Sequence, residues 1–315
     1  MKLHGEAPKQ ASRWVSSLQA WNINRGAYDT AMKFPSVQAR TALVTGCSSG
    51  IGLATAQVLR AAGWQVFPTA RKPADLEQLR TAGFTPVALD VAEAESVRVA
   101  AAEVLALCGG QLGALVNNAG YGQPGALEDL SRTALREQFE TNIVGLQDLT
   151  NQFIPLFRRQ GWGRIVNVSS VVGRLPLPLM GAYSASKFAL EALSDCLRLE
   201  LRGSGVAVSI IEPGPIDTEF RTNASAAGWK HLADLKASHF AGYYRRNAEQ
   251  PDRPKARDRY ALPPEAVAAK ILHALASSHP RTRYPVTLVA WAGGFLRRVA
   301  PDALVDRLLA HRVAD

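Results

Sequence analysis

Tyr183 and Lys187 stand four residues apart in the segment YSASK, so on a helix they would share a face. A free tyrosine has a pKa of about 10, too high for an efficient base near neutral pH. A lysine ammonium beside it favours the phenolate and lowers that pKa, so the pair could transfer a proton. The same spacing also occurs in unrelated surface pairs. Ser170, at the end of the preceding apolar run, favours the catalytic interpretation.

A second segment with chemical potential is TGCSSGIG, at residues 45–52, directly after the apolar run 41–45. Glycines allow a tight turn and let a pyrophosphate approach main-chain N–H groups at the start of a helix. The spacing is GxxxGxG rather than GxGxxG, and such turns often serve only packing. Because this one lies between a predicted strand and a predicted helix, we expect it to bind a dinucleotide.

Arg71 follows the second predicted strand, where NAD-specific sites usually place an acid for the ribose 2′-hydroxyl. No Asp or Glu occurs between Gly50 and Lys72. A guanidinium is a planar, multi-donor partner for phosphate, so this position favours NADP(H). The alternative is a solvated charge at the end of a strand.

These residues need a scaffold that brings them together, and the hydrophobic pattern predicts one. Apolar runs alternate with helical segments, which is typical of βαβ units and a parallel sheet. The runs have almost no polar interruptions, as expected of strands covered on both faces. We therefore predict an α/β fold: a doubly wound (Rossmann), mainly seven-stranded parallel sheet in a single domain. The expected strands are 41–45, 64–69, 84–89, 112–116, 164–169, 206–212 and 284–289, and the expected helices are 50–62, 74–82, 92–107, 131–159, 183–202, 264–277 and 295–311.

The domain division follows from where this pattern begins and ends. Residues 1–40 form a poorly ordered N-terminal extension, which is a transit-like segment or the product of an early start before Met32. Residues 41–290 form the catalytic domain. Within it, 214–262 is too long for an ordinary loop and is interpreted as a substrate lid containing Phe240, Tyr243 and Tyr244. Residues 291–315 form a C-terminal amphipathic helix, with an interfacial helix as the alternative.

The composition is that of a globular protein: 315 residues, 47% hydrophobic and 20% charged, with a net charge of +9. The basic excess falls in residues 1–40, 219–259 and 281–315. Solvated surface charge explains it, and peripheral contact with acidic lipids is the alternative. No nucleic-acid motif accompanies it. Three scattered cysteines and six histidines have no metal spacing, so we expect no metal and a reduced, cytoplasmic location.

Between about Thr41 and Thr218, several independent motifs together resemble those of the short-chain dehydrogenase/reductase family. They are TGCSSGIG, Asp90-Val91, Asn117-Asn118-Ala119-Gly120, Asn142, Ser170, Tyr183 with Lys187, and Pro213-Gly214 with Thr218. The resemblance implies that Ser170 orients the carbonyl oxygen, Tyr183 transfers the proton, Lys187 also holds the nicotinamide ribose, and Asn142 maintains a water relay.

The resemblance also implies a binding site for NADP(H). The glycine turn would take the phosphates, Arg71 the 2′-phosphate, Asp90 and Val91 the adenine, and residues 213–218 the nicotinamide end. The implied cofactor residues are Gly46, Ser48, Ser49, Gly50, Ile51, Gly52, Arg71, Asp90, Val91, Asn118, Ala119, Gly120, Lys187, Pro213, Gly214, Ile216 and Thr218.

The segments 261–268 and 280–284 resemble the family branch of 17β-hydroxysteroid dehydrogenases, retinol dehydrogenases and acyl-dihydroxyacetone-phosphate reductases. This resemblance implies a bulky apolar alcohol or carbonyl substrate and a homo-oligomer. The alternatives are a 3-oxoacyl or fatty-acyl reductase, an epimerase-like enzyme, and a non-catalytic NADP(H) sensor, since a fold alone does not define a function.

Overall fold

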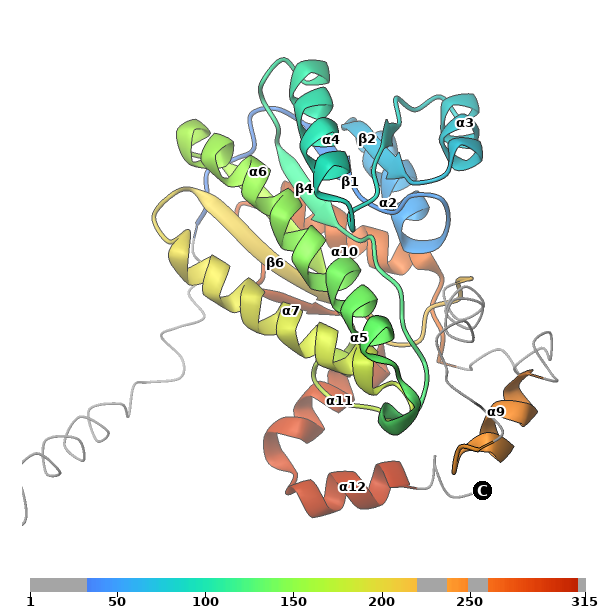
Figure 1. The fold of residues 1–315 in the computed structure, drawn as a ribbon. Helices are drawn as coiled ribbons and strands as arrows, with labels where there is room; N and C mark the ends of the chain where they lie inside the picture. The colour runs from blue at the N-terminus through green and yellow to red at the C-terminus, as the bar shows by residue number, and fades with distance from the viewer. Residues whose placement is uncertain (1–32, 220–236, 249–259, 311–315) are drawn as a thin grey trace, which may run out of the picture. The chain divides into compact units, whose positions relative to one another are not determined.

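A parallel sheet occupies the centre of the computed structural model, which describes residues 33–219, 237–248 and 260–310 (Figure 1). In this described part the sheet has seven strands in the order β3-β2-β1-β4-β5-β6-β7. All of its pairings are parallel. The strands are β1 (Thr41–Val44), β2 (Gln65–Ala70), β3 (Val87–Ala88), β4 (Ala114–Asn117), β5 (Gly163–Val168), β6 (Val206–Glu212) and β7 (Arg283–Pro285). The predicted doubly wound fold is confirmed.

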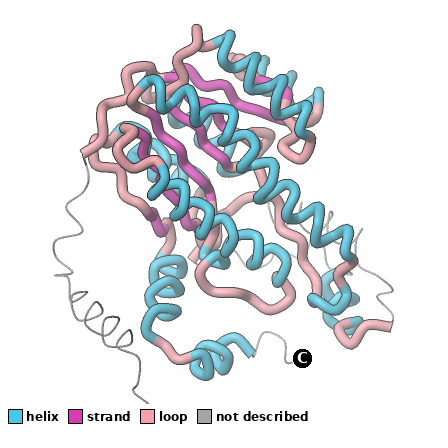
Figure 2. Tube along the Cα trace, turned by 60° about the vertical axis from the view of Figure 1, so that its left-hand side comes forward, coloured by secondary structure: helices cyan, strands magenta, loops and turns pink. Residues whose placement is uncertain are grey.

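Helices cover both faces of this sheet (Figure 2). On one face an apolar core joins α2 (Gly50–Ala61), α3 (Pro73–Thr81) and α10 (Pro264–Ala276) to the strands. On the other face a second core joins α4 (Ala94–Leu107), α6 (Gly145–Gln160) and α7 (Gly181–Glu200). Burial on both faces explains why β1, β4 and β6 are apolar along most of their length, whereas β5, also buried throughout, includes Arg164 and Asn167.

The strand order reverses between β1 and β4, which pair side by side although β2 and β3 separate them in the chain. The connections from these two strands therefore leave in opposite directions at the carboxyl edge. Ligands of open α/β sheets bind at such a switch point. The fold thus places the predicted glycine turn and the segment 117–120 at the usual position of a binding crevice.

The helix expected over residues 131–159 is divided into three parts. They are α5 (Arg132–Phe139), a single π-helical turn η2 (Glu140–Val144), and α6. The division lies where the chain passes closest to its neighbour, since a Cβ on Gly145 would stand 1.7 Å from the Val91 carbonyl oxygen. Isolated π turns are frequent at functional sites. Asn142 lies within this one, fully buried.

The expectation for the C-terminus also needs correction. The strand predicted to extend to 289 ends at Pro285, because Thr287 caps a helix by accepting a hydrogen bond from the Ala290 N–H at 3.1 Å. The single helix expected over 295–311 is two helices, α11 (Leu288–Val299) and α12 (Asp302–Ala310). Pro301 stands between them, where proline removes a helical hydrogen bond.

The last residues of the expected N-terminal extension pack on the domain instead of lying outside it. The Phe34 N–H donates to the Ser278 carbonyl at 2.9 Å, and Arg164 donates to the Pro35 carbonyl at 2.8 Å. Arg164 is only 1% exposed, and burial lowers its pKa to about 10. Residues 1–32, which carry most of the predicted extension, lie outside the described residues.

Part of the expected lid is described, as the helix α9 (Ala241–Ala248) and the residues just before it. Tyr244 anchors this helix to the short helix η1 (Leu127–Asp129): its hydroxyl donates to the Asp129 carboxylate at 2.6 Å and accepts from the Ala126 N–H at 2.8 Å. Ser238 donates to the same carboxylate at 2.7 Å. The lid residues 220–236 and 249–259 lie outside the described residues.

Candidate active site

The glycine turn after β1 has the backbone geometry that its sequence predicts. Gly46 and Gly50 have φ values of +70° and +56°, a region that side chains rarely adopt. A Cβ on Gly52 would stand 2.1 Å from the Gly46 carbonyl oxygen, so the third glycine permits a close turn of the chain on itself. Any residue larger than glycine would open this turn.

The turn delivers the N-terminus of α2 to the carboxyl edge of the sheet. In the described structure the side chain of its N-cap residue, Ser49, makes no capping hydrogen bond, and the first turn holds no acid. The first N–H groups of the helix therefore remain available, at the positive end of the helix dipole. This arrangement fits the pyrophosphate of a dinucleotide, for which the glycine cradle leaves room.

Hydrogen bonds brace this turn against the segment that follows β4. The Thr45 hydroxyl accepts from the N–H groups of Asn118 and Ala119 at 2.9 and 2.8 Å. The Asn118 side chain donates in return to the carbonyls of Thr45 and Gly46 at 2.8 and 3.1 Å. Asn118 thus lies where it was predicted. Thr45 supports the site too: it is the first residue of the predicted segment TGCSSGIG but was not among the predicted cofactor residues.

Arg71 and Asp90 come together at the ends of β2 and β3. The guanidinium Nη1 lies 3.6 Å from the Asp90 carboxylate, and the arginine side chain is 69% exposed. Asp90 also accepts from the Ala92 N–H at 3.1 Å, which fixes the loop, while Val91 is buried. An exposed arginine held only at this distance has free donors that could reach a phosphate.

Ser170, Tyr183 and Lys187 lie together at the other side of the switch point. Ser170 follows β5 and caps the short helix η3 (Val171–Gly173), and its hydroxyl hydrogen bonds to Tyr183. Tyr183 and Lys187 both come from the first two turns of α7 and are almost fully buried. The Lys187 Nζ donates to the Val168 carbonyl at 2.8 Å and lies 5.8 Å from the centre of the Tyr183 ring.

Burial acts on the two titratable groups in opposite directions. It raises the pKa of Tyr183 to about 12, although the hydrogen bond from Ser170 acts against the shift. It lowers the pKa of Lys187 to about 8, which the negative charge of Glu191 partly offsets. In both cases the low-dielectric surroundings favour the neutral form. The expected lowering of the Tyr183 pKa by Lys187 is therefore not seen in this structure, because burial of the phenol dominates.

The π turn places Asn142 beside this pair. Its side-chain amide accepts from the Tyr121 N–H at 3.1 Å and donates to the Tyr121 carbonyl at 3.0 Å. It also donates to the Ser186 hydroxyl at 3.1 Å. A Cβ on Gly120 would lie 3.0 Å from the Asn142 Oδ1 and 3.9 Å from the Lys187 Nζ, so the three residues surround one small space.

Residues 213–218 close the site from the end of β6. The Pro213 carbonyl accepts from the Val171 N–H at 2.8 Å, and Ile216 forms an isolated bridge with Leu262. A Cβ on Gly214 would stand 2.0 Å from the Thr287 hydroxyl, the cap of α11. Thr218 lies over the glycine turn, since a Cβ on Gly50 would come 3.3 Å from its methyl group.

An apolar cavity of about 640 Å³ opens beside the N-terminus of α7, two residues ahead of Tyr183. Leu179 in its wall has a φ of +60°, and backbone strain of this kind in a branched side chain is uncommon away from functional sites. The lining residues are Ala126, Leu127, Glu128, Pro176, Leu177, Pro178, Leu179, Gly181, Phe240, Asp306, Leu309 and Ala310.

The predicted site residues therefore gather along the carboxyl edge of the sheet in two groups. The glycine turn, Arg71, Asp90 and Asn118 lie by β1 to β4, and Ser170, Tyr183 and Lys187 lie by β5 and α7. Sequence reasoning missed Ser186 and Tyr121, which hold Asn142. The position of Ser186 inside YSASK could have suggested its role, whereas Tyr121 acts through its backbone and left no such signal.

Comparison with known proteins agrees with this geometry. The family model for short chain dehydrogenases matches residues 40–228. An uncharacterized oxidoreductase of Escherichia coli K12, YbbO, is 43% identical over 87% of this chain and 95% of its own. An NADPH-dependent 3-dehydrocapnine reductase of Ornithobacterium rhinotracheale is 34% identical over 85% and 95%. Human retinol dehydrogenase 8 is 35% identical over 78% and 80%.

The solved structures that resemble this chain include complexes with NADP and complexes with NAD. A short chain dehydrogenase of Burkholderia cenocepacia in complex with NADP has a TM-score of 0.68 at 25% identity, over 87% of this chain and 99% of its own. One from Burkholderia phymatum in complex with NAD has the same TM-score and identity, over 84% and 94%. The chain belongs to the short-chain dehydrogenase/reductase family, oxidoreductases that bind a nicotinamide cofactor.

Proposed function

We propose that this protein uses NADP(H) to interconvert an alcohol and a ketone or aldehyde, with Tyr183 as the proton-transfer residue. The observation that carries the proposal is the buried set of Ser170, Tyr183 and Lys187, on the same sheet edge as an intact glycine turn. When bound, the nicotinamide would supply or accept the hydride. The protein would supply placement, electrostatics and the proton.

In the reductive direction, the Ser170 hydroxyl would donate a hydrogen bond to the carbonyl oxygen and the Tyr183 hydroxyl would give it a proton. The Lys187 ammonium would stabilise the resulting phenolate, because a positive charge nearby favours the charged form of the tyrosine. Lys187 would also hold the nicotinamide ribose. Asn142, fixed by Tyr121 and Ser186, would position the water that returns a proton to this pair.

Preference for the phosphorylated cofactor is a separate part of the proposal. Arg71 is largely exposed at the end of β2, and the sequence from Gly50 to Lys72 has no acid to repel a 2′-phosphate. The Asp90 carboxylate lies 3.6 Å from Arg71 and would compete for the guanidinium. The similar 3-dehydrocapnine reductase is NADPH-dependent, which supports this preference, whereas the similar Burkholderia phymatum structure holds NAD.

We propose a bulky, apolar carbonyl compound or alcohol as the substrate. The cavity at the N-terminus of α7 is lined mainly by leucine, proline and alanine, with Phe240 from the lid, and Gly181 in its wall lies two residues before Tyr183 in the chain. Apolar walls with few polar groups select for apolar ligands. Two of the similar proteins are named for their substrates, retinol and 3-dehydrocapnine, and retinol is itself a bulky apolar alcohol. A 3-oxoacyl or fatty-acyl reductase remains the second candidate within the same site.

The deciding experiment is NADPH oxidation with a panel of aldehydes and ketones that runs from small polar to long-chain and polycyclic compounds. We expect long-chain or polycyclic carbonyls to have at least about tenfold higher kcat/KM, ~1.4 kcal/mol, than glyceraldehyde-sized ones. The reverse order would contradict the apolar substrate. Tight NADPH binding without turnover of any member would favour the non-catalytic sensor.

We also propose peripheral contact with an acidic lipid surface, through α11. Leu288, Trp291 and Phe295 are exposed on one face of this helix, and the two rings stack at 5.9 Å. Arg298 lies beside that face in the last turn. Aromatic and basic residues together favour the membrane interface. Co-sedimentation with vesicles containing phosphatidylglycerol, but not with neutral ones, is the expected result, and Trp291→Ser with Phe295→Ser should abolish it.

No helix among the described residues has the length and apolarity of a segment that crosses a bilayer. Vesicle binding that survives the double substitution would contradict this role for α11. Concentration-dependent self-association that disappears in the same variant would assign the exposed face to a second copy of the chain instead.

A further inference from the structure

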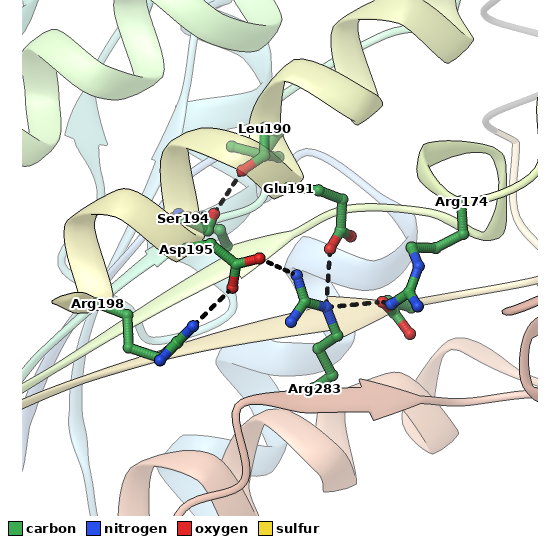
Figure 3. Close-up of polar contacts among 9 residues, drawn as sticks. Arg174, Leu190, Glu191, Ser194, Asp195, Arg198 and Arg283 are labelled. Atoms are coloured by element: carbon green, nitrogen blue, oxygen red, sulfur yellow. Dashed lines mark hydrogen bonds and ion pairs between the residues drawn. The ribbon is translucent and has the colours of Figure 1, made fainter. Parts of the chain in front are cut away.

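Six charged side chains form a cluster between α7, the helix that carries Tyr183 and Lys187, and the strands β6 and β7 (Figure 3). Arg283 of β7 is at its centre. The cluster consists of three carboxylates and three guanidinium groups: Glu191, Asp195, Glu212, Arg174, Arg198 and Arg283. Its formal charges balance, which is the usual condition for burying ionised groups.

Arg283 contacts all three carboxylates of this cluster. Its Nε lies 3.0 Å from Glu191 and 3.4 Å from Glu212, and its Nη2 lies 2.7 Å from Asp195. The other two arginines complete the set, because Arg174 pairs with Glu212 at 2.9 Å and Arg198 with Asp195 at 3.1 Å. Among the described residues, Glu191 is the one carboxylate of the cluster whose ion pair involves Arg283 alone.

Glu191 lies one helical turn after Lys187, and both side chains are buried. Lys187 itself donates to a neutral acceptor, the Val168 carbonyl. Among the described residues no carboxylate forms an ion pair with Lys187. The negative charge of Glu191 nevertheless opposes the effect of burial on the Lys187 pKa, since a buried site screens charges weakly.

The charge of Glu191 depends in turn on its neighbours. The net effect is a raised pKa for Glu191: burial is the largest cause and the nearby Glu212 adds to it, whereas the Ser169 hydroxyl and Arg283 lower it. Without Arg283 this pKa would rise further, the carboxyl would keep its proton up to a higher pH, and its field at Lys187 would weaken. The charged groups that face Glu191 are Lys187 and Asp195 on α7, Glu212 on β6, Arg283 on β7 and Arg174 after η3.

We propose that Glu191 is a positioning residue for Lys187: held by Arg283, it supplies the fixed negative charge that keeps the buried lysine protonated for cofactor binding and proton transfer. The inference rests on the proposed function, because it gives Lys187 its role there. It differs from a purely structural role, in which the cluster would only tie α7 to the sheet.

The test is Glu191→Gln in the full chain, with NADPH affinity measured by fluorescence and turnover measured at a series of pH values. Loss of a negative charge favours deprotonation of both Lys187 and Tyr183. Both apparent pKa values should therefore move to lower pH, by about one unit. NADPH affinity should begin to fall at a lower pH than in the parent, whether or not the assayed carbonyl is the natural substrate.

Two variants act as controls. Asp195→Asn removes a carboxylate from the same helix and the same arginine, but one turn further from Lys187, so its pH profiles should match those of the parent. Glu191→Asp keeps the charge and should restore most of the parental profile. If Asp195→Asn shifts the profiles as much as Glu191→Gln, or Glu191→Asp fails to restore them, the cluster acts structurally and the inference is wrong.

If Glu191→Gln alone leaves Arg283 without its partner and prevents folding, both members of the ion pair can be replaced together. Glu191→Gln with Arg283→Gln leaves the pairs Asp195–Arg198 and Glu212–Arg174 in place and the cluster neutral. The NADPH profile should still move to lower pH, and an unchanged profile would overturn the inference. If no carbonyl is reduced but the NADPH profile moves, the proposed function fails while the role of Glu191 stands.

Discussion

Burial raises the pKa of the Tyr183 hydroxyl to about 12. A group with this pKa holds its proton at neutral pH, as the proposed donor role in reduction needs. In the oxidative direction of the proposed reaction Tyr183 would have to lose this proton, which the nearby Lys187 ammonium and the positive charge of an oxidised nicotinamide would favour. We therefore expect the pKa of Tyr183 to fall when the oxidised cofactor binds.

Tyr183→Phe should lower turnover by about 10²–10⁴-fold, the range of general acid–base catalysis, while the protein still folds and binds NADPH. The ring fills the same buried space, and only the hydroxyl is lost. Lys187→Ala should in addition weaken NADPH binding, which a fluorescence titration distinguishes. A folded, NADPH-binding Tyr183→Phe protein that keeps more than about a tenth of parental turnover, a loss under ~1.4 kcal/mol, would exclude Tyr183 as the donor.

Arg71→Ala should weaken NADPH binding by roughly 1.5–3 kcal/mol, the range for hydrogen bonds to charged groups, and change NADH binding little. The effect is specific because the 2′-phosphate is the only part of the cofactor that differs. Michaelis constants for both cofactors, in the parent and the variant, provide the measurement. Equal constants for NADH and NADPH in the parent would remove the basis for the preference.

At the scale of elements, Tyr244 attaches α9 to the segment 126–129 of the cavity wall through two hydrogen bonds. Its hydroxyl satisfies both Asp129 and the Ala126 N–H, and loss of such a buried partner costs about 1–3 kcal/mol. Phe240, which lines the cavity, lies one helical turn before Tyr244. The position of Phe240 in the cavity wall thus depends on the hydrogen bonds of the Tyr244 hydroxyl, which does not line the cavity itself.

Tyr244→Phe should raise KM for long apolar substrates several-fold and leave kcat and the KM of small substrates nearly unchanged. The reason is that the wall formed by Phe240 loosens while Tyr183 and Lys187 keep their contacts. Steady-state kinetics with a short and a long aldehyde give the measurement, and Tyr243→Phe, a more exposed neighbour on the same helix, is the control. Equal changes in both variants would contradict the role of the Tyr244 hydroxyl.

Sequence patterns predicted the elements whose signals are local and strong. Apolar β-branched runs identified the strands, and the glycine turn and YSASK identified both halves of the site, since each needs particular residues at fixed spacing. The π turn at 140–144 was not predictable from periodicity, because it arises where Gly145 passes Val91. The sequence around Thr287 is β-branched and was predicted as a strand. In the structure its hydroxyl caps α11, and this cap depends on backbone geometry that the sequence pattern does not reveal.

For the whole molecule, one face of α7 carries small and apolar residues with spacings of three and four. Ala185, Phe188, Ala192, Cys196 and Leu199 are all exposed. A helix stripe of this spacing is typical of a helix that packs on another. A solvent-facing position for Phe188 and Leu199 in a monomer would be unfavourable, and we propose that a second copy of the chain covers the stripe.

Ala192→Glu should weaken self-association at least about tenfold, ~1.4 kcal/mol, because two-fold symmetry would bring two carboxylates into the interface. Light scattering coupled to size-exclusion chromatography over a concentration series measures this effect. Ala102→Glu places the same charge on the exposed face of α4 and should leave the association state unchanged. A monomeric parent, or equal behaviour of the two variants, would contradict the interface.

The close approach of Gly214 to Thr287 joins two separate parts of the chain, the turn that follows β6 and the N-cap of α11. Residue 214 can become larger only if residue 287 also changes. A side chain at 214 would displace the threonine hydroxyl, release the first turn of α11 and disturb Pro213 beside it. Related sequences should therefore show covariation here, with a larger residue at 214 only where 287 is small or the last two helices follow another path. Such covariation would mean that α11 and the turn after β6 evolved together, and that the C-terminal helices were not added independently of the proposed cofactor site.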